Sequence, residues 1–145
     1  MSREKYFITK LHSSTKRNYL ERMLDNKVEC MKIASKFEND YWDGDRRYGY
    51  GGYKYIEGRW TKVAKKIIKT YKLKNKSKIL DLGCGKGFLL YEIKKILESI
   101  NIVGLDISKH ALKNAHPEIK KYLYIHDMRK KLKFKKNEFD LVLAI

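Results

Sequence analysis

The stretch Lys78–Phe88, with the sequence KILDLGCGKGF, decides the fold of this chain. Its first half is apolar around one acid, Asp81, and its second half has glycine at three alternate positions, Gly83, Gly85 and Gly87. An amphipathic run follows. This order predicts a buried strand, a tight backbone turn and the start of a helix. Glycine in such a turn permits positive φ angles and lets a ligand lie directly against the backbone.

The spacing of the glycines separates two kinds of nucleotide-binding turn. A dinucleotide fingerprint is G-x-G-x-x-G, and its acid comes only after the second strand. Here the third glycine comes one residue early, Phe88 stands where that pattern has glycine, and Asp81 precedes the first glycine by two residues. The stretch therefore resembles the class I S-adenosylmethionine-dependent methyltransferases. The alternative interpretation is an ordinary tight strand-to-helix turn.

The resemblance implies S-adenosylmethionine as the cofactor. In that family the acid before the glycines helps to orient the methionine part of the cofactor, directly or through water, and the amino-acid moiety packs against the glycine loop. Carried over to this chain, the contacts come from Asp81, Gly83, Cys84, Gly85, Gly87 and Phe88. We interpret the Cys84 thiol as a packing group and not as a nucleophile.

A second predicted strand, residues 101–108 (NIVGLDIS), follows one helix later. It carries Asp106 near its carboxyl end, 19 residues after Gly87. An acid at this point can accept hydrogen bonds from both ribose hydroxyls. The resemblance places the ribose acid of the family at Asp106 and a residue flanking the adenine at Ile107. The alternative role for Asp106 is to cap the next helix, predicted over residues 109–116.

The third predicted strand, residues 122–125, leads into Asp127 and Met128. The resemblance assigns Asp127 to the adenine amino group and makes Met128 the apolar neighbour of the ring. The following stretch, residues 129–136 (RKKLKFKK), has six basic residues in eight. It is either a solvated connection or a nucleic-acid contact.

The fourth predicted strand, residues 139–145 (FDLVLAI), is the last element of the sequence. The family continues with further strands and with the residues that face the methyl group, so we expect a fragment or a gene product cut short. The expected fold class is α/β, a partial Rossmann-like, doubly wound and mainly parallel sheet of about four strands. The resemblance covers residues 78–145, the cofactor half, and assigns no catalytic residue.

Residues 1–60 form the first expected unit, a helical segment followed by an aromatic, glycine-rich lid, and residues 61–145 form the second, the partial cofactor-binding domain. Residues 14–37 are predicted to be helical, with a break at Asp25-Asn26. Apolar residues at helical spacing give this segment a predicted buried face, made of Leu20, Met23, Leu24, Val28, Met31 and Ala34. A further helix is predicted from the regular stripe of Trp60, Val63, Ala64, Ile67, Ile68 and Tyr71.

The segment Tyr41–Trp60 holds five of the nine glycines, five of the eleven tyrosines and both tryptophans. It fits neither a helical nor a strand period, so we expect a long ordered loop. Three roles stay open: an active-site cover, a structural wrap, and a surface that stacks on unpaired bases. Arg59 is our candidate for binding the cofactor carboxylate, because a guanidinium suits that geometry. The alternative for Arg59 is a surface or structural salt bridge.

Composition limits the function classes further. The 145 residues contain 34 basic and 17 acidic side chains, a net charge of +17, of which +13 falls in residues 61–145. Such a charge attracts nucleic acid, although enrichment in lysine, asparagine and isoleucine also reflects an AT-rich genome. No apolar run reaches membrane-spanning length and the N-terminus lacks a signal-peptide core, so we expect a cytoplasmic protein without a membrane partner. Two cysteines and four scattered histidines suggest neither a disulfide framework nor a metal site.

The resemblance implies a methyltransferase that moves a methyl group by in-line displacement, and we expect a small-molecule acceptor beneath the aromatic segment. One alternative is a nucleic-acid (RNA) methyltransferase guided by the lysine-rich half. The other is a non-catalytic fragment that binds S-adenosylmethionine.

Overall fold

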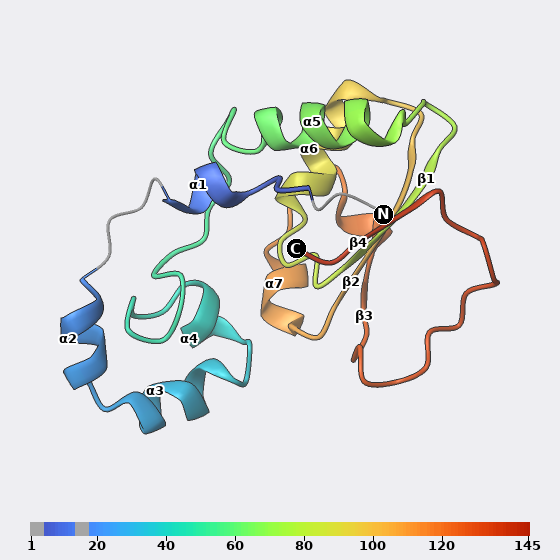
Figure 1. Cartoon of the computed structure of the whole chain (residues 1–145). Helices are drawn as coiled ribbons and strands as arrows, with labels where there is room; N and C mark the ends of the chain where they lie inside the picture. Colours follow the sequence, from blue (N-terminus) through green and yellow to red (C-terminus); the bar gives the residue numbers. More distant parts are fainter. Residues whose placement is uncertain (1–4, 14–17) are drawn as a thin grey trace.

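The computed structural model describes residues 5–13 and 18–145. Its centre is a four-stranded sheet of order β3-β2-β1-β4, in which every pairing is parallel (Figure 1). The strands are β1 (Lys78–Leu82), β2 (Asn101–Asp106), β3 (Leu123–Ile125) and β4 (Leu141–Leu143). The helices are α1 (Thr9–Ser13), α2 (Tyr19–Leu24), α3 (Lys27–Ala34), α4 (Asn39–Trp42), α5 (Thr61–Tyr71), α6 (Phe88–Ile96), α7 (Lys109–Lys113) and a 3₁₀ turn, η1 (Lys120–Tyr122). The predicted Rossmann-like α/β fold is confirmed.

Strand β1 lies inside the sheet, paired with β2 on one side and with β4 on the other. This explains its apolar sequence, because a parallel strand covered on both faces has little contact with water. Ile79 is fully buried and Leu80 is 2% exposed. The chain leaves β1 through a turn whose Gly83 and Cys84 N–H groups both donate to the Leu105 carbonyl, at 2.8 and 3.0 Å. The turn is therefore fixed to the carboxyl end of β2.

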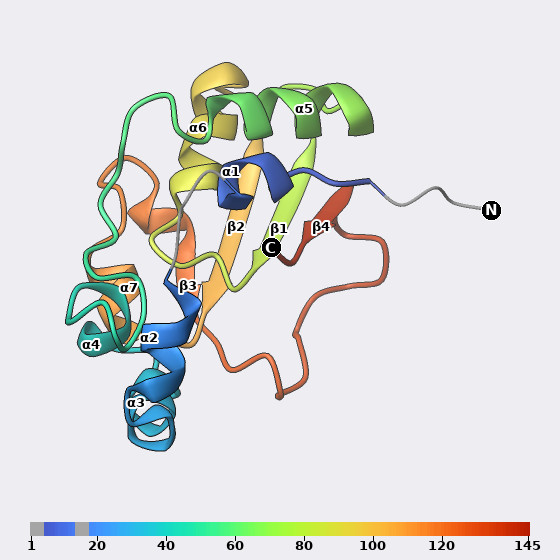
Figure 2. The same ribbon diagram turned by 60° about the vertical axis from the view of Figure 1, so that its left-hand side comes forward.

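Helices α5 and α6 pack against one another at one end of the sheet (Figure 2). The stripe predicted for α5 is confirmed at its centre, where Val63, Ala64 and Ile67 are buried, while Tyr71 at its end is exposed. Helix α6 buries Leu89, Leu90 and Ile93 in the same core. The prediction for residues 109–116 was too long, since α7 ends at Lys113.

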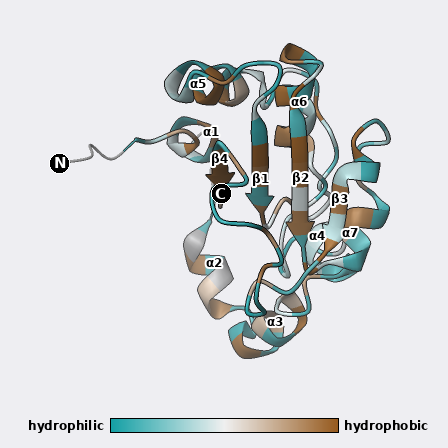
Figure 3. Cartoon of the chain, turned by 90° about the vertical axis from the view of Figure 1, so that its right-hand side faces the viewer, coloured by the Kyte–Doolittle hydropathy of each residue, from teal (hydrophilic) through white to brown (hydrophobic). Residues whose placement is uncertain are grey.

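Residues 14–17 of the segment predicted to be helical lie outside the described residues. Over the rest of the segment, the predicted buried face is wrong. Leu20, Met23 and Leu24 are 69%, 70% and 81% exposed, and Val28 and Met31 are exposed as well. Figure 3 shows α2 and α3 projecting from the body of the chain, at the end away from α5 and α6. The predicted break is confirmed, because Asp25 ends α2 and Asn26 caps α3. Two helices of six and eight residues set at an angle cannot lay one apolar stripe along the sheet, so helical spacing alone did not decide burial.

Residues 38–60, called the cap from here on, connect these helices to α5. The cap begins with α4 and continues as the loop predicted for residues 41–60, so that Tyr41 and Trp42 are helical. Aromatic contacts hold the loop in place: Trp42 stacks on Tyr50 with centroids 5.2 Å apart, and Tyr53 stacks on Phe88 of α6 at 5.1 Å. Trp42 is 7% exposed and belongs to the central core. The division into units at residue 60 stays a prediction.

Within the described residues, no helix has the length and apolar character that a membrane crossing requires.

Candidate functional site

The turn over residues 83–87, called the glycine turn below, has the backbone conformation that its composition predicts. The φ angles of Gly83, Gly85 and Gly87 are +77°, +55° and +72°, a region that side chains with a Cβ occupy at a cost. A Cβ on Gly83 would meet no atom within 4 Å, so the backbone there is bare. A Cβ on Gly87 would lie 2.3 Å from the Ile119 Cδ1. Gly83 therefore leaves space for a ligand, whereas Gly87 is required by packing.

Asp81 lies near the carboxyl end of β1, just before this turn, and is 4% exposed. Its carboxylate makes no hydrogen bond to any residue that the structure describes. Burial, assisted by the nearby charge of Asp106, raises the pKa of Asp81 to about 7. A buried carboxylate without a partner is costly when charged, so a cationic group beside it would be stabilised.

Asp106 ends β2 and is 6% exposed. Its Oδ2 accepts from the Gly85 N–H at 2.7 Å and its Oδ1 accepts from the Ser108 N–H at 2.8 Å. It therefore ties the glycine turn to the start of α7. Ser108 itself caps α7 through the Ala111 N–H at 2.9 Å, so capping of this helix falls to Ser108 and not to Asp106. Each carboxylate oxygen keeps a further lone pair for a donor such as a ribose hydroxyl.

A cavity of about 980 Å³ is lined by residues of both the glycine turn and the cap. Six of the predicted cofactor residues line it: Asp81, Gly83, Cys84, Gly85, Phe88 and Arg59. Burial raises the pKa of the Cys84 thiol, which keeps it protonated and fits its predicted packing role. The other five predicted residues do not line the cavity: Gly87, Asp106, Ile107, Asp127 and Met128.

Asp127 and Met128 lie in the loop after β3. Both Asp127 oxygens accept from the Arg129 guanidinium, at 2.7 to 3.1 Å, and these hydrogen bonds lower the pKa of Asp127 to about 2. Met128 and Ile107 are 37% and 41% exposed. In this conformation Met128 and Ile107 are exposed and Asp127 is bound to Arg129, so the adenine contacts predicted for these residues stay a prediction.

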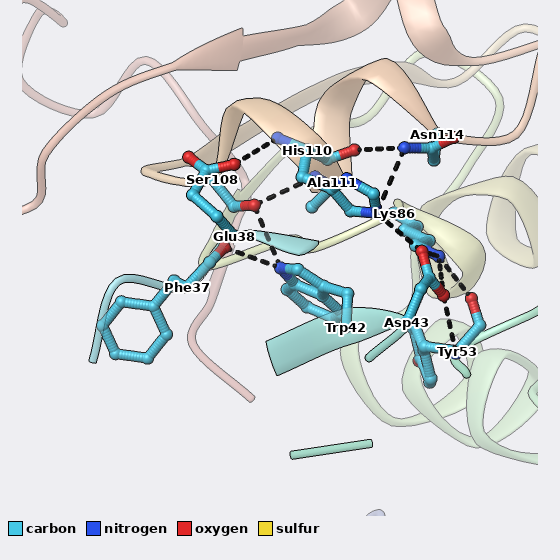
Figure 4. A network of polar contacts seen from close by, with 10 residues as sticks. All are labelled: Phe37, Glu38, Trp42, Asp43, Tyr53, Lys86, Ser108, His110, Ala111 and Asn114. Carbon is cyan, nitrogen blue, oxygen red and sulfur yellow. Dashed lines mark hydrogen bonds and ion pairs between the residues drawn. The ribbon is translucent and has the colours of Figure 1, made fainter. Parts of the chain in front are cut away.

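An ion-pair network, drawn in Figure 4, fixes the cap to the glycine turn. Lys86, in the turn, is 4% exposed, and its Nζ donates at 2.7 Å to both Asp43 oxygens and to the Tyr53 carbonyl. The His110 Nε2 lies 2.6 Å from Asp43 Oδ2. Partial burial would raise the pKa of Asp43, but the hydrogen bonds from Lys86 and His110 outweigh it and lower the pKa to about 2. Sequence reasoning missed this network; its only signal was a lysine inside a buried glycine turn.

The helix α4 is docked on the start of α7 by two further contacts (Figure 4). Trp42 Nε1 donates to the Ser108 Oγ and to the Phe37 carbonyl, both at 3.0 Å. The Glu38 carboxylate accepts from the Lys109 and His110 N–H groups, at 3.1 and 2.9 Å. The Trp42 ring also lies against Gly85, so Trp42 contacts both residues whose N–H groups donate to Asp106, Gly85 and Ser108. The sequence did not predict this position of Trp42.

A family model described as "Methyltransferase domain" matches residues 73–145 of this chain, which include the glycine turn and all four strands. No curated protein matches the chain at the level of sequence.

Several solved structures are similar to the chain. The MccD protein is 32% identical over 55% of this chain and 37% of its own, with a TM-score of 0.48. A SAM-dependent methyltransferase from Aquifex aeolicus is 20% identical over 63% of this chain and 57% of its own, with a TM-score of 0.45. Coclaurine N-methyltransferase, bound to N-methylheliamine and SAH, is 14% identical over 95% of this chain and 45% of its own, with a TM-score of 0.50, and supports the fold. The chain spans 37–57% of the length of these three proteins.

Proposed function

Since this chain belongs to the methyltransferase-domain family, we propose that it is the cofactor-binding half of an S-adenosylmethionine-dependent methyltransferase. One observation carries the proposal: a buried, unpaired carboxylate and a bare glycine backbone face the same large cavity. Asp81 supplies the carboxylate and Gly83 the bare backbone.

The groups on the cavity wall fit the amino-acid end of this cofactor. Its ammonium and sulfonium groups are positive, and Asp81 is the group that a positive charge would stabilise. Its carboxylate needs a cation, and the Arg59 guanidinium lines the same cavity without a hydrogen bond or ion pair to any described residue. The backbone at Gly83 lets the chain of the ligand approach closely.

When bound, S-adenosylmethionine supplies a methyl group on a positively charged sulfur, ready for in-line displacement. The residues of this chain have to bind, orient and dehydrate the reactants. Asp81 and Arg59 would fix the amino-acid end, and the aromatic residues of the cap would exclude water. Such alignment is worth about 7–11 kcal/mol in well-oriented reactions, without any covalent intermediate on the protein.

Asp106 is 6% exposed and does not line the cavity, and Trp42 contacts both Gly85 and Ser108, whose N–H groups donate to the Asp106 carboxylate. A ribose would therefore reach this carboxylate only after the cap shifts. We therefore propose that the cofactor enters when α4 moves away from α7. The acceptor is a small molecule that binds on the cap side of the cavity.

Calorimetric titration with S-adenosylhomocysteine tests the proposal. We expect binding to the 145-residue chain, and we expect Asp106→Asn to weaken it about tenfold, since hydrogen bonds to a charged group are worth about 1.5–3 kcal/mol. Asp40→Asn is the matched control, because Asp40 is exposed and lies outside the cavity. No binding by the wild-type chain, or equal losses in the two variants, would contradict the assignment.

Nucleic acid is the second candidate acceptor. The segment 129–136 keeps its six basic side chains exposed, outside the cavity and beyond the end of β3. The salt dependence of binding separates the two candidates. The affinity for an acceptor RNA would fall steeply as the salt concentration rises, whereas the affinity for a neutral small molecule would not. The cytoplasm stays the predicted compartment.

A further inference from the structure

The cap side of the 980 Å³ cavity is unusually aromatic. Eight of the 22 residues that line the cavity are aromatic, and seven of them come from residues 41–60. Tyr50 and Trp42 stack almost parallel, with 6° between their rings, and Tyr50 and Tyr53 lie 4.6 Å apart. Aromatic side chains that line a cavity favour a flat ligand, because ring pairs gain about 0.5–1.5 kcal/mol beyond the area that they bury.

The volume leaves room for a second molecule beside the cofactor. Ligand pockets usually measure about 300–1,000 Å³, and this cavity lies at the upper end of that range. Asp81 and Gly83, which fit the amino-acid end of the cofactor, come from β1 and the glycine turn, and Arg59 comes from the end of the cap. The aromatic wall is formed mainly by the cap, a separate part of the chain.

The charges on the wall are unbalanced. Arg46, Lys54 and Arg59 line the cavity, whereas Asp81 is the only acidic side chain among the described residues that line it. Arg46 donates to the Tyr50 carbonyl, which holds one guanidinium against the aromatic residues. The cofactor carboxylate can neutralise one of these cations, and the sulfonium adds another positive charge. A cationic acceptor would therefore be repelled, and an anionic one would be attracted.

We propose that the acceptor is a flat aromatic small molecule that carries a negatively charged oxygen, a carboxylate or a phenolate. This inference rests on the proposed function and specifies its acceptor. The ring would lie against the tyrosines of the cap. The charge would be held by Lys54, which makes no hydrogen bond or ion pair to a described residue, whereas Arg46 donates to the Tyr50 carbonyl.

The chemistry is balanced without a further reactant. A lone pair of the acceptor oxygen forms the new oxygen–carbon bond as the sulfur–methyl bond breaks, and that bonding pair stays on sulfur. The anion and the sulfonium become a neutral methyl ester or ether and a neutral thioether. Because the oxygen is already deprotonated, no catalytic base is needed.

Three probes with matched features test the proposal by calorimetry, with and without saturating S-adenosylhomocysteine. They are 2-naphthoate, 2-naphthylmethylamine, which has the same ring and the opposite charge, and cyclohexanecarboxylate, which has the same charge without an aromatic ring. We expect 2-naphthoate to bind about three- to tenfold more tightly than cyclohexanecarboxylate, the range that ring stacking gives. The amine is expected to bind most weakly of the three.

Two lysine variants test where the charge is recognised. Lys54→Met is expected to weaken the binding of 2-naphthoate about two- to fivefold, the size of one exposed charge interaction. Lys65→Met is the control, because Lys65 is exposed on α5 and lies off the cavity wall. Equal effects of the two variants would overturn the charge assignment, and so would tighter binding of the amine.

The outcome is separate from that of the proposed function. If S-adenosylhomocysteine binds but 2-naphthoate gives no heat in either titration, this inference is wrong and the cofactor assignment stands. If 2-naphthoate binds and S-adenosylhomocysteine does not, the aromatic cavity is supported and the proposed function fails.

Discussion

Trp42 and Gly85 are in contact across the boundary between the cap and the glycine turn. A Cβ atom added to Gly85 would lie 2.6 Å from the Cη2 of Trp42. The indole of Trp42 is also held by its hydrogen bond to Ser108. The cap therefore rests on the same backbone that the cofactor is expected to touch, and closure of the cap and ligand binding are linked at this contact.

Two of the three glycines of the turn, Gly83 and Gly85, give a matched pair of substitutions. Gly85→Ala combines a positive φ with a clash against a buried ring, and we expect it to lower the free energy of unfolding by about 2–4 kcal/mol. Gly83→Ala has the φ cost alone, about 1–2 kcal/mol, because its Cβ meets no atom. Urea unfolding measures both. Gly83→Ala is also expected to weaken the binding of S-adenosylhomocysteine. Equal free energies of unfolding for the two variants would contradict the Trp42 contact.

Removal of the Asp43 charge should loosen the cap. In Asp43→Asn the Lys86 ammonium stays buried and loses its charged partner, so we expect a loss of about 2–4 kcal/mol at pH 7. The double variant Asp43→Asn/Lys86→Met should recover part of this loss, because no unpaired buried charge is left. Urea unfolding of the single and double variants provides the measurement. A double variant less stable than Asp43→Asn would show that the ion pair does not act in this way.

Asp81 should make the stability of the chain depend on pH. Its pKa is raised from 3.8 to about 7 in the folded chain, so between pH 4 and 7 the folded state holds a proton that the unfolded state has lost. The resulting stabilisation is complete below pH 4 and disappears as the pH rises through 7, by up to about 4 kcal/mol. Asp81→Asn lacks this group. The free energy of unfolding of the wild type relative to Asp81→Asn, measured in urea from pH 4 to 8, should therefore fall with pH; a flat difference would refute the raised pKa.

The contrast between buried and exposed apolar residues can be tested on two helices. Ile67→Ala in α5 removes a fully buried side chain and should cost about 2–5 kcal/mol. Leu24→Ala at the end of α2 removes a side chain that is 81% exposed, and its effect should stay within about 0.5 kcal/mol. Thermal or urea unfolding distinguishes the two. A large loss for Leu24→Ala would mean that α2 packs against the body of the chain.

The parallel sheet was expected from the family resemblance, and the sequence alone determined the strands, the glycine turn and the places of Asp81 and Asp106 near the strand ends. These features are local, since apolar runs and glycine spacing act through backbone conformation and burial of the nearest residues. The α5 stripe was predictable for the same reason. The same helical spacing misled at Leu20–Met31, because periodicity shows that a face is apolar and not that a partner covers it.

Only the tertiary structure decided how the cap meets the sheet. The partners of Lys86, Asp43 and Tyr53, lie 43 and 33 residues away along the chain, and Ser108 lies 66 residues from Trp42. Such pairs leave no spacing signal, because each depends on where a loop without regular structure comes to rest. That placement brings Asp81 into one cavity with the aromatic and basic residues of the cap. Residues so far apart in sequence share a cavity only after the chain has folded.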